Sequence, residues 1–427
     1  MMDQCWNMPE GLSDEEGKLE ALRCLSCKEP RCETGCPTSM RIRDFIKEIK
    51  NDNLSGAYDI IRECSNLPSI CSIVCPHEKQ CIGHCILNAK QKPINCGALE
   101  RYVVERVSKP HEIKHNSSLN VAVIGAGPAG ISCAMELAKN GSKVTIFEAT
   151  DTFGGVMTTG IPSYRLAYER VNKIKEEVES LGIEVCYNHK MTESQILKLK
   201  ESYDAIFIGV GLPKVKSLHI KGEDLKGVYN ALDYLKQVND YVKFGKGSMP
   251  VLSKHTIVIG AGNVAMDAAR CAVRNGSKVT VAYRRNRELA PATKKEIREA
   301  EAEGVIFKFL NSPVEIIGET SVQGLKVELM ELGEPDASGR SRPVGTGKYT
   351  TLECESIISA IGQNPEDLYD SGVLKTDSLY LSCEDLKTNV AGIYAGGDIV
   401  LGAKTVVEAM ACGKRAAHLI FQDLEVK

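Results

Sequence analysis

Cysteines crowd the first quarter of the chain and fall into two closely spaced runs. Of the 17 cysteines, eleven precede residue 100. The first run, from Cys24 to Pro37, has the spacing C-x2-C-x4-C-x3-C-P, and the second, CSIVCPHEKQCIGHC, extends from Cys71 to Cys85. Thiolates in short loops, together with Cys-Pro, are typical of iron–sulfur sites. The runs therefore predict two 4Fe-4S clusters. Structural zinc is the alternative, although zinc ribbons favour separate C-x2-C pairs.

A glycine-rich loop follows an apolar stretch in VAVIGAGPAG, residues 121–130. The stretch reads as a buried strand that ends in G-x-G-x-x-G at the entry to a helix. Gly125 permits the tight turn, Gly127 lets a pyrophosphate approach the backbone, and Gly130 lets the helix pack on the strand. The next strand ends in Glu148, where a carboxylate accepts hydrogen bonds from a ribose. These residues predict a site for an adenine dinucleotide, the alternative being a glycine-rich turn that binds nothing.

The motif of an apolar stretch followed by a glycine-rich loop occurs a second time in the sequence. Residues 256–265 read TIVIGAGNVA, so that Gly260 and Gly262 correspond to the first two glycines of the earlier loop. The sequence NGSKVT is also repeated, at residues 140–145 and 275–280. One offset aligns the glycines, the helix and the second strand, which indicates two related dinucleotide-binding domains.

The repeat changes at the residue that contacts the ribose. Glu148 corresponds to Tyr283, and Arg284 and Arg285 follow directly. Loss of the carboxylate removes repulsion against a 2′-phosphate, and two guanidinium groups supply charged donors for it. The second site is therefore predicted to bind NADP(H), and the alternative is a solvated basic loop.

Three later features point to a flavin in the first site. Gly154 and Gly155 let the backbone approach a ligand a second time. In IYAGGDI, residues 393–399, Asp398 follows a strand and a pair of glycines, where a carboxylate can accept from a ribityl hydroxyl; an ordinary turn residue is the alternative. A helix predicted from Lys404 to Ala417 would direct its N-terminal amides at the flavin pyrimidine.

The helices and strands that must position these residues can also be predicted from the sequence. Apolar residues at helical spacing between Ile42 and Glu63 predict a small helical domain for the cysteines. YDAIFIGVG at residues 203–211 and IISAIGQNP at 357–365 read as two buried strands at which the chain leaves the first dinucleotide domain and returns to it. The fold class is α/β, with two nested Rossmann-like domains behind an α-helical iron–sulfur domain. The predicted boundaries are 1–115 for the iron–sulfur domain, 116–253 and 360–427 for the two parts of the FAD-binding domain, and 254–359 for the NADPH-binding domain.

Composition narrows the functional classes. The 427 residues carry a formal net charge of −3, which argues against a broad nucleic-acid or membrane surface. No apolar run has the length of a transmembrane helix, and the acidic N-terminus does not resemble a signal peptide, so the expected location is cytoplasmic. The six cysteines after residue 100 form no C-x-x-C pair, which argues against a dithiol reductase.

These motifs together, from Cys24 to Ala417, resemble the family of the small subunit of NADPH-dependent glutamate synthase. They are also similar to the N-terminal half of dihydropyrimidine dehydrogenase and to the flavin subunit of electron-bifurcating ferredoxin–NADP oxidoreductase. The segments YRR and GEPD favour the glutamate synthase branch. The resemblance implies FAD, NADPH and two 4Fe-4S clusters as cofactors, and a hetero-oligomer with a separate catalytic subunit or a ferredoxin-like acceptor.

Ligand sets follow from the resemblance, position by position. One cluster would take Cys24, Cys27, Cys32 and Cys85, and the other Cys36, Cys75, Cys81 and Glu100. Cys96 is close enough in sequence to compete with Glu100 as the fourth ligand, and Cys71 matches a family cysteine that is not a ligand. FAD would contact Gly125, Gly127, Pro128, Ala129, Gly130, Glu148, Gly155, Val156, Arg165, Gly397, Asp398, Lys404, Thr405 and Val406. NADPH would contact Gly262, Asn263, Val264, Arg284, Arg285, Ile361 and Gly362.

The expected activity is electron input. Nicotinamide gives two electrons as a hydride, clusters accept one at a time, and a flavin does both, so the flavin must stand between them. Hydride transfer needs no acid or base, so no catalytic side chain is named. Alternatives are the NAD(P)H-oxidising subunit of a dihydropyrimidine dehydrogenase or ferredoxin–NADP oxidoreductase complex and, from another class, a non-catalytic, zinc-stabilised nucleotide sensor.

Overall fold

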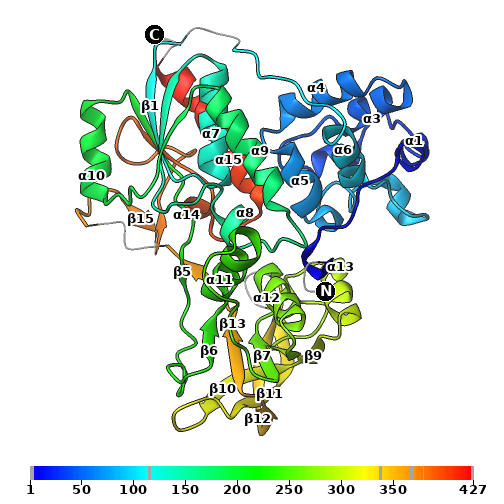
Figure 1. Ribbon diagram of the computed structural model, residues 1–427, viewed down its shortest axis with the longest axis vertical. Coiled ribbons are helices and arrows are strands. Elements are labelled where there is room, and N and C mark those ends of the chain that lie inside the picture. The colour runs from blue at the N-terminus through cyan, green and yellow to red at the C-terminus, as the bar shows by residue number, and fades with distance from the viewer. Residues whose placement is uncertain (1–3, 114–116, 336–338, 366–369, 378, 425–427) are drawn as a thin grey trace. The chain divides into compact units, whose positions relative to one another are not determined.

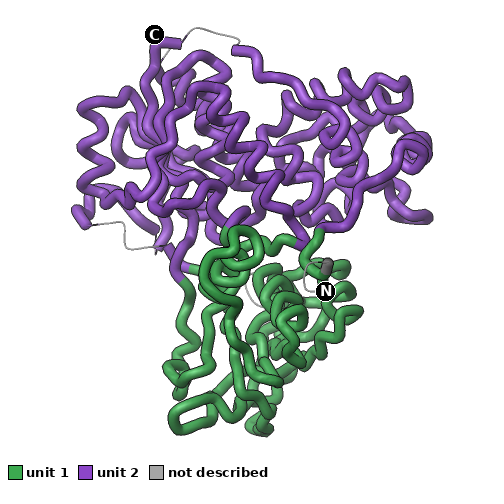
Figure 2. Tube along the Cα trace, viewed as in Figure 1, with its two compact units in different colours: residues 1–7, 159–163, 215–363 green, residues 8–158, 164–214, 364–427 purple. Residues whose placement is uncertain are grey.

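A computed structural model describes residues 4–113, 117–335, 339–365, 370–377 and 379–424. The chain forms two compact units, each assembled from separate stretches of sequence (Figure 2). The larger unit holds residues 8–158, 164–214 and 364–427, and the smaller holds residues 159–163 and 215–363 together with the first seven. No helix in the described part of the chain is long and apolar enough to cross a membrane.

The N-terminal part of the larger unit is helical, as predicted. Phe45, Ile46 and Ile49 line one face of the third helix and are buried against Ile61 and Leu99 of two others. Apolar residues at this spacing form a continuous stripe on a helix, which explains why the segment folds as it does. The elements are α1 (Asp14–Leu22), α2 (Arg31–Thr34), α3 (Ile42–Lys50), α4 (Leu54–Cys64), α5 (Pro68–Val74) and α6 (Cys96–Val104), with short 3-10 turns at His77–Lys79 and Ile86–Ala89.

The rest of the larger unit is a five-stranded parallel sheet with the order β17-β4-β1-β2-β3 (Figure 1). The edge strand β17 follows its neighbour β4 by nearly two hundred residues in the sequence, because between them the chain leaves this unit and returns. The strands are β1 (Asn120–Ile124), β2 (Lys143–Phe147), β3 (Glu184–Cys186), β4 (Ala205–Ile208) and β17 (Ile393–Ala395). The helices are α7 (Pro128–Lys139), α8 (Val156–Thr159), α9 (Tyr168–Ser180), α10 (Glu193–Lys198), α14 (Asp398–Leu401) and α15 (Val406–Leu424), with a 3-10 turn at Leu199–Glu201 and a short pair β15 (Thr376–Asp377) and β16 (Tyr380–Leu381).

Helices α7 and α15 pack closely side by side, although they are far apart in sequence (Figure 1). A side chain at Gly413 of α15 would collide with the carbonyl oxygen of Ala129. The glycine therefore permits a close approach that brings the C-terminal helix against the entry of α7.

The smaller unit contains a second parallel sheet, of order β6-β13-β7-β8-β9, and an antiparallel sheet, β10-β11-β12. The parallel strands are β6 (Val228–Asn230), β7 (His255–Ile259), β8 (Lys278–Tyr283), β9 (Ile306–Phe309) and β13 (Ser356–Ser359). The antiparallel strands are β10 (Asn311–Ile317), β11 (Gly324–Pro335) and β12 (Ser341–Glu353), and the helices are α11 (Ala231–Phe244), α12 (Asn263–Arg274) and α13 (Lys294–Ala302), with a 3-10 turn at Gln4–Trp6. The long excursion into the smaller unit begins within β5 (Lys214–Val215) and ends within β14 (Gln363–Asn364).

The two parallel sheets confirm the predicted α/β class with two Rossmann-like domains. The two compact units group the chain differently from the predicted domains. Residues 215–253 join the smaller unit, because β6 pairs with β13 and α11 packs on α12. The helical cysteine region and the first sheet form one unit, because α5 contacts α9 and α15. Strands β11 and β12 pair in antiparallel fashion, and residues 336–338 between them lie outside the described residues.

Candidate functional site

The first glycine loop forms an open cradle at the start of α7. Gly125 has φ +102°, a conformation that favours glycine, and a side chain at Gly130 would strike the carbonyl of Gly125. Gly127 is the N-cap, and nothing lies within 4 Å of the position its Cβ would occupy. The space beside Gly127 and the backbone amides in the first turn of α7 fit a bound phosphate.

Glu148 lies at the C-terminal end of β2, beside this cradle, and is buried. Its Oε2 accepts a hydrogen bond from the amide of Ala126 at 2.8 Å, and its Oε1 accepts from the amide and the hydroxyl of Thr150 at 2.9 and 2.8 Å. The carboxylate is thereby oriented at the edge of the glycine loop. Sequence reasoning missed Thr150, for which its position two residues after Glu148 is the available clue.

Two further predicted segments meet the same cradle. A Cβ at Gly155, which has φ +54°, would lie 3.0 Å from the Cα of Gly127. A Cβ at Gly397, with φ +73°, would lie 2.9 Å from the Cβ of Ala129. The fold thus brings the loops at 154–156 and 396–398 to the glycine loop. Val156 is 41% exposed, and Arg165 is half-buried.

Asp398 follows Gly397, and its Oδ1 accepts a hydrogen bond from the amide of Lys404 at 3.2 Å. Burial raises the pKa of this carboxyl to about 6. Thr405 caps α15: its Oγ1 accepts from the amide of Glu408 at 3.3 Å, and Glu408 accepts from the amide of Thr405 at 3.0 Å. The helix therefore begins at Val406, two residues after the predicted start at Lys404.

The second glycine loop has the same form. Gly260 has φ +124°, and a side chain there would strike the carbonyl of Ala360. Gly262 is the N-cap of α12, and no atom lies within 4 Å of its Cβ position. Asn263 and Val264 form the first turn of that helix. Because β13 lies beside β7, the turn with Ile361 and Gly362 comes to the edge of the same cradle.

The two arginines after β8 differ in their surroundings. Arg284 is exposed and makes no hydrogen bond or ion pair within the described part of the chain. Arg285 is buried, and its Nε donates to the carbonyl oxygen of Ser341 on β12 at 3.2 Å. The sequence suggested equivalent roles, but in the bend after β8 only Arg285 is buried and bonded to β12.

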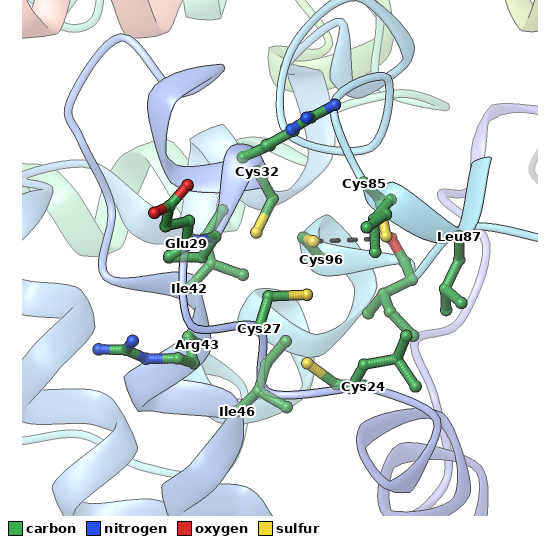
Figure 3. A pocket seen from close by; sticks show the side chains of 15 residues that line it. Cys24, Cys27, Glu29, Cys32, Ile42, Arg43, Ile46, Cys85, Leu87 and Cys96 are labelled. Carbon is green, nitrogen blue, oxygen red and sulfur yellow. Dashed lines mark hydrogen bonds between the residues drawn. The ribbon is translucent and has the colours of Figure 1, made fainter. Parts of the chain in front are cut away.

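The first predicted set of cysteines converges on one pocket. Cys24, Cys27, Cys32 and Cys85 line it, and Figure 3 shows their sulfur atoms directed towards one another. Helix α3 contributes Ile42 and Ile46 to the wall, and Cys96 also reaches it. Burial, reinforced by nearby acidic groups, raises the pKa of Cys32 to about 12. Four sulfur atoms around an apolar pocket are the donor set that an iron–sulfur cluster requires.

The second predicted set surrounds a buried carboxyl group. Burial and the adjacent thiols of Cys71, Cys81 and Cys64 raise the pKa of Glu100 well above its usual value, and its Oε1 has no hydrogen-bond partner. Cys36 and Cys75 also lie within electrostatic reach of this carboxyl. A buried carboxylate oxygen without a hydrogen-bond partner is suited to binding a metal ion, which would satisfy it.

Cys96 has a different environment, since its thiol interacts with Cys81 and with the carbonyl of Ile94. Among the described residues, no group of three or more His, Cys, Asp or Glu side chains has an arrangement that could hold a metal ion.

Two family models match the chain. Residues 119–413 match the pyridine nucleotide-disulphide oxidoreductase family, and residues 2–112 match dihydropyrimidine dehydrogenase domain II, 4Fe-4S cluster. The second match assigns the helical region to the iron–sulfur type, in place of zinc. The part of the chain that matches the first family, after residue 100, contains no C-x-x-C pair of cysteines.

Solved structures share the fold of the two sheets. FprA of Mycobacterium tuberculosis in complex with NADPH superposes with a TM-score of 0.63 at 22% identity, covering 73% of this chain and 85% of FprA. The thioredoxin reductase of Lactococcus lactis gives a TM-score of 0.55 at 23% identity, over 73% of this chain and 100% of the reductase. At these identities the likeness describes architecture alone.

Sequence relatives extend over nearly the whole chain. The glutamate synthase [NADPH] small chain of Escherichia coli K12 is 35% identical over 98% of this chain and 93% of its own length. The NADP(+)-dependent formate dehydrogenase subunit beta of Moorella thermoacetica is 37% identical over 92% of this chain and 60% of that subunit. The chain is therefore an oxidoreductase with an N-terminal 4Fe-4S domain, and it belongs to the pyridine nucleotide-disulphide oxidoreductase family and, within it, to the family of glutamate synthase small chains.

Proposed function

We propose that the chain is an electron-input subunit that oxidises NADPH and passes electrons one at a time to an acceptor on another polypeptide. The observation that carries this proposal is the presence, in one chain, of two open glycine cradles and a pocket lined by four cysteines in a region of the 4Fe-4S type. When bound, FAD exchanges a hydride with NADPH and single electrons with iron–sulfur clusters, so the set of cofactors links paired to single electron transfer.

The first cradle would hold FAD. The amides at the start of α7 would bind its pyrophosphate, and Glu148 would accept hydrogen bonds from the ribose. Asp398 would accept from the ribityl chain, because its carboxylate lies at the segment that approaches Ala129. The N-terminal amides of α15, which begins at Val406, would favour negative charge on the ring system.

The second cradle would hold NADPH. The start of α12 would bind the pyrophosphate, as in the first cradle. Arg284 would bind the 2′-phosphate, which an NADH molecule lacks, because its guanidinium group is exposed and unengaged among the described residues. Tyr283 stands where Glu148 stands in the first domain and adds no negative charge to repel that phosphate.

The cysteine groups would hold two 4Fe-4S clusters. Cys24, Cys27, Cys32 and Cys85 would bind the first, in the pocket to which Ile42 and Ile46 contribute. Cys36, Cys75, Cys81 and Glu100 would bind the second. Glu100 is favoured over Cys96 because its Oε1 lacks any partner, whereas the thiol of Cys96 interacts with Cys81.

The acceptor would be a separate catalytic subunit or a ferredoxin-like protein, so the chain would work in a hetero-oligomer. This follows the names of its relatives, which denote a small chain or a beta subunit of larger enzymes. Glutamate synthase is the favoured assembly, since this chain covers 93% of the Escherichia coli small chain but only 60% of the formate dehydrogenase subunit.

Anaerobic purification tests the proposal. The protein should contain FAD, iron and sulfide, and addition of NADPH should bleach its visible absorption much faster than addition of NADH. A one-electron acceptor such as ferricyanide should then restore the absorption. Protein that is colourless and free of iron, or that is reduced equally fast by both nucleotides, would contradict the proposal. Co-purification from the native source would identify the acceptor.

A further inference from the structure

The side chain of Met410 connects α15 to the helical cysteine region. Met410 is fully buried, and its Sδ lies 4.0 Å from Sγ of Cys71 and 3.4 Å from Oγ of Ser65. The thiol and the hydroxyl both donate towards the thioether sulfur. Helices α5 and α15 are in contact here, although Cys71 and Met410 are 339 residues apart (Figure 1).

On one side, Met410 is close to the predicted flavin contacts. It lies four residues after Val406, the first residue of α15, which is about one helical turn or roughly 6 Å along the axis. Lys404 and Thr405, which precede the helix, are held by Asp398 and Glu408. The sulfur of Met410 is thus placed one turn behind the end of the helix that would face FAD.

On the other side, Cys71 is close to a predicted cluster ligand. Cys71 and Cys75 are four residues apart at the end of α5, where the amide of Cys75 donates to the carbonyl of Cys71 at 3.2 Å. Their side chains also interact. Cys71 is 3% exposed, and its thiol therefore occupies a buried position between Met410 and Cys75.

Asn66 fixes the segment that carries these residues. Its Nδ2 donates to the carbonyl and hydroxyl oxygens of Ser132, both at 3.1 Å, and to Glu136 at 3.2 Å, while Lys139 donates to its Oδ1. All three partners belong to α7. Asn66 is completely buried, so these bonds are shielded from competing water. The segment from Ser65 to Cys71 is thereby locked onto the dinucleotide domain.

We propose that Met410 and Cys71 form the junction for electron transfer between the flavin site and the second cysteine group, as positioning residues that are not ligands. This inference rests on the proposed function. Each transfer moves one electron from reduced flavin to an oxidised cluster, so that the flavin is oxidised and the cluster is reduced. No bond at either sulfur forms or breaks, and the thiol of Cys71 keeps its proton. The two side chains contribute continuous packing between α15 and the end of α5 that carries Cys75.

Variants at Met410 test the packing. After a single addition of NADPH without oxygen, stopped-flow absorption would follow flavin reduction, and freeze-quench EPR would follow cluster reduction. Met410→Ala should leave flavin reduction within about twofold of wild type but slow cluster reduction by about fivefold or more, because it leaves a void at the junction. Met410→Leu, which refills most of that volume, should restore the rate to within about twofold. Met135→Ala on α7, which also removes a fully buried methionine, is the matched control and should not change the ratio of the two rates.

Variants at Cys71 test the other side of the contact. Cys71→Ala should keep the full iron content, because Cys71 is not a ligand, but should slow cluster reduction as Met410→Ala does. Cys71→Ser, whose hydroxyl can still donate to Sδ of Met410, should restore most of that rate. The proposal fails if the clusters of the Met410→Ala variant are reduced at the wild-type rate. It also fails if the Cys71→Ala variant loses a cluster, which would show that Cys71 is a ligand. Wild-type protein without iron or flavin would instead overturn the proposed function.

Discussion

The Nε atom of Arg285 lies 3.2 Å from the carbonyl oxygen of Ser341, whereas the neighbouring Arg284 is exposed and unengaged among the described residues. The two adjacent arginines, which look equivalent in the sequence, therefore have different surroundings in the structure. Arg285 attaches the β11–β12 hairpin to the end of β8, and Arg284 is the guanidinium group left for a ligand.

We therefore expect Arg284→Gln to raise the KM for NADPH by about 10- to 100-fold, since a charged hydrogen bond contributes roughly 1.5–3 kcal/mol. The KM for NADH should not change. Arg285→Gln should instead lower the free energy of unfolding by about 1–3 kcal/mol, because it leaves buried partners unsatisfied. Steady-state kinetics and urea unfolding measure the two effects. Arg287→Gln, which removes an exposed partner of Glu301, is the control, and a larger KM effect from Arg285→Gln would contradict the division.

The second prediction concerns the two N-cap glycines. Gly127 and Gly262 have φ values of −86° and −90°, which any residue can adopt, and their Cβ positions meet no atom within 4 Å. Valine at either position should therefore fold but fill the space predicted for a phosphate. Gly127→Val should yield protein without FAD, whereas Gly262→Val should retain FAD that NADPH no longer reduces but dithionite does.

Absorption spectra after desalting measure both results. Circular dichroism provides the control for folding. Retention of FAD by Gly127→Val, or normal reduction of Gly262→Val by NADPH, would show that the dinucleotides bind elsewhere.

The third prediction concerns Asp398, whose pKa burial raises to about 6. If its carboxylate accepts a hydrogen bond from FAD, binding favours the charged form, so protonation must weaken binding. FAD affinity should be constant above pH 6 and fall below it by up to about tenfold per pH unit. Asp398→Asn should bind FAD more weakly at neutral pH and lose this dependence.

The fluorescence of released FAD provides the measurement. Asp385→Asn is a suitable control, because Asp385 is exposed and paired with Arg415 at the surface. The role assigned to Asp398 would be wrong if the asparagine variant kept the wild-type pH profile.

The fourth prediction concerns the fourth ligand of the second cluster. Glu100→Ala should reduce the iron content from about eight to about four atoms per chain, because it removes the unpartnered carboxylate oxygen. Cys96→Ser should retain all the iron, since the hydroxyl can replace the thiol in its bond to the carbonyl of Ile94. Anaerobic iron and sulfide analysis measures both. The reverse pattern would identify Cys96 as the ligand.

Much of this protein could be predicted from local sequence. The glycines of each loop specify a strand, a tight turn and a helix entry within ten residues, because only glycine accepts the φ of +102° at Gly125 and of +124° at Gly260 without strain. The repeat of that motif predicts two related domains, and the short spacing of the cysteines indicates iron–sulfur chemistry in the helical region. These features depend on neighbours in the chain, so that the sequence by itself determined them.

Tertiary structure alone decided which distant residues meet. Cys85 completes the pocket of Cys24 because the helical domain folds back on itself, and Gly397 reaches Ala129 because β17 adds to the sheet beside β4. The different fates of Arg284 and Arg285, and the contact of Met410 with Cys71, likewise depend on strand order and helix packing. Such contacts are set by the burial of whole faces, which couples residues hundreds of positions apart, and no local pattern records them.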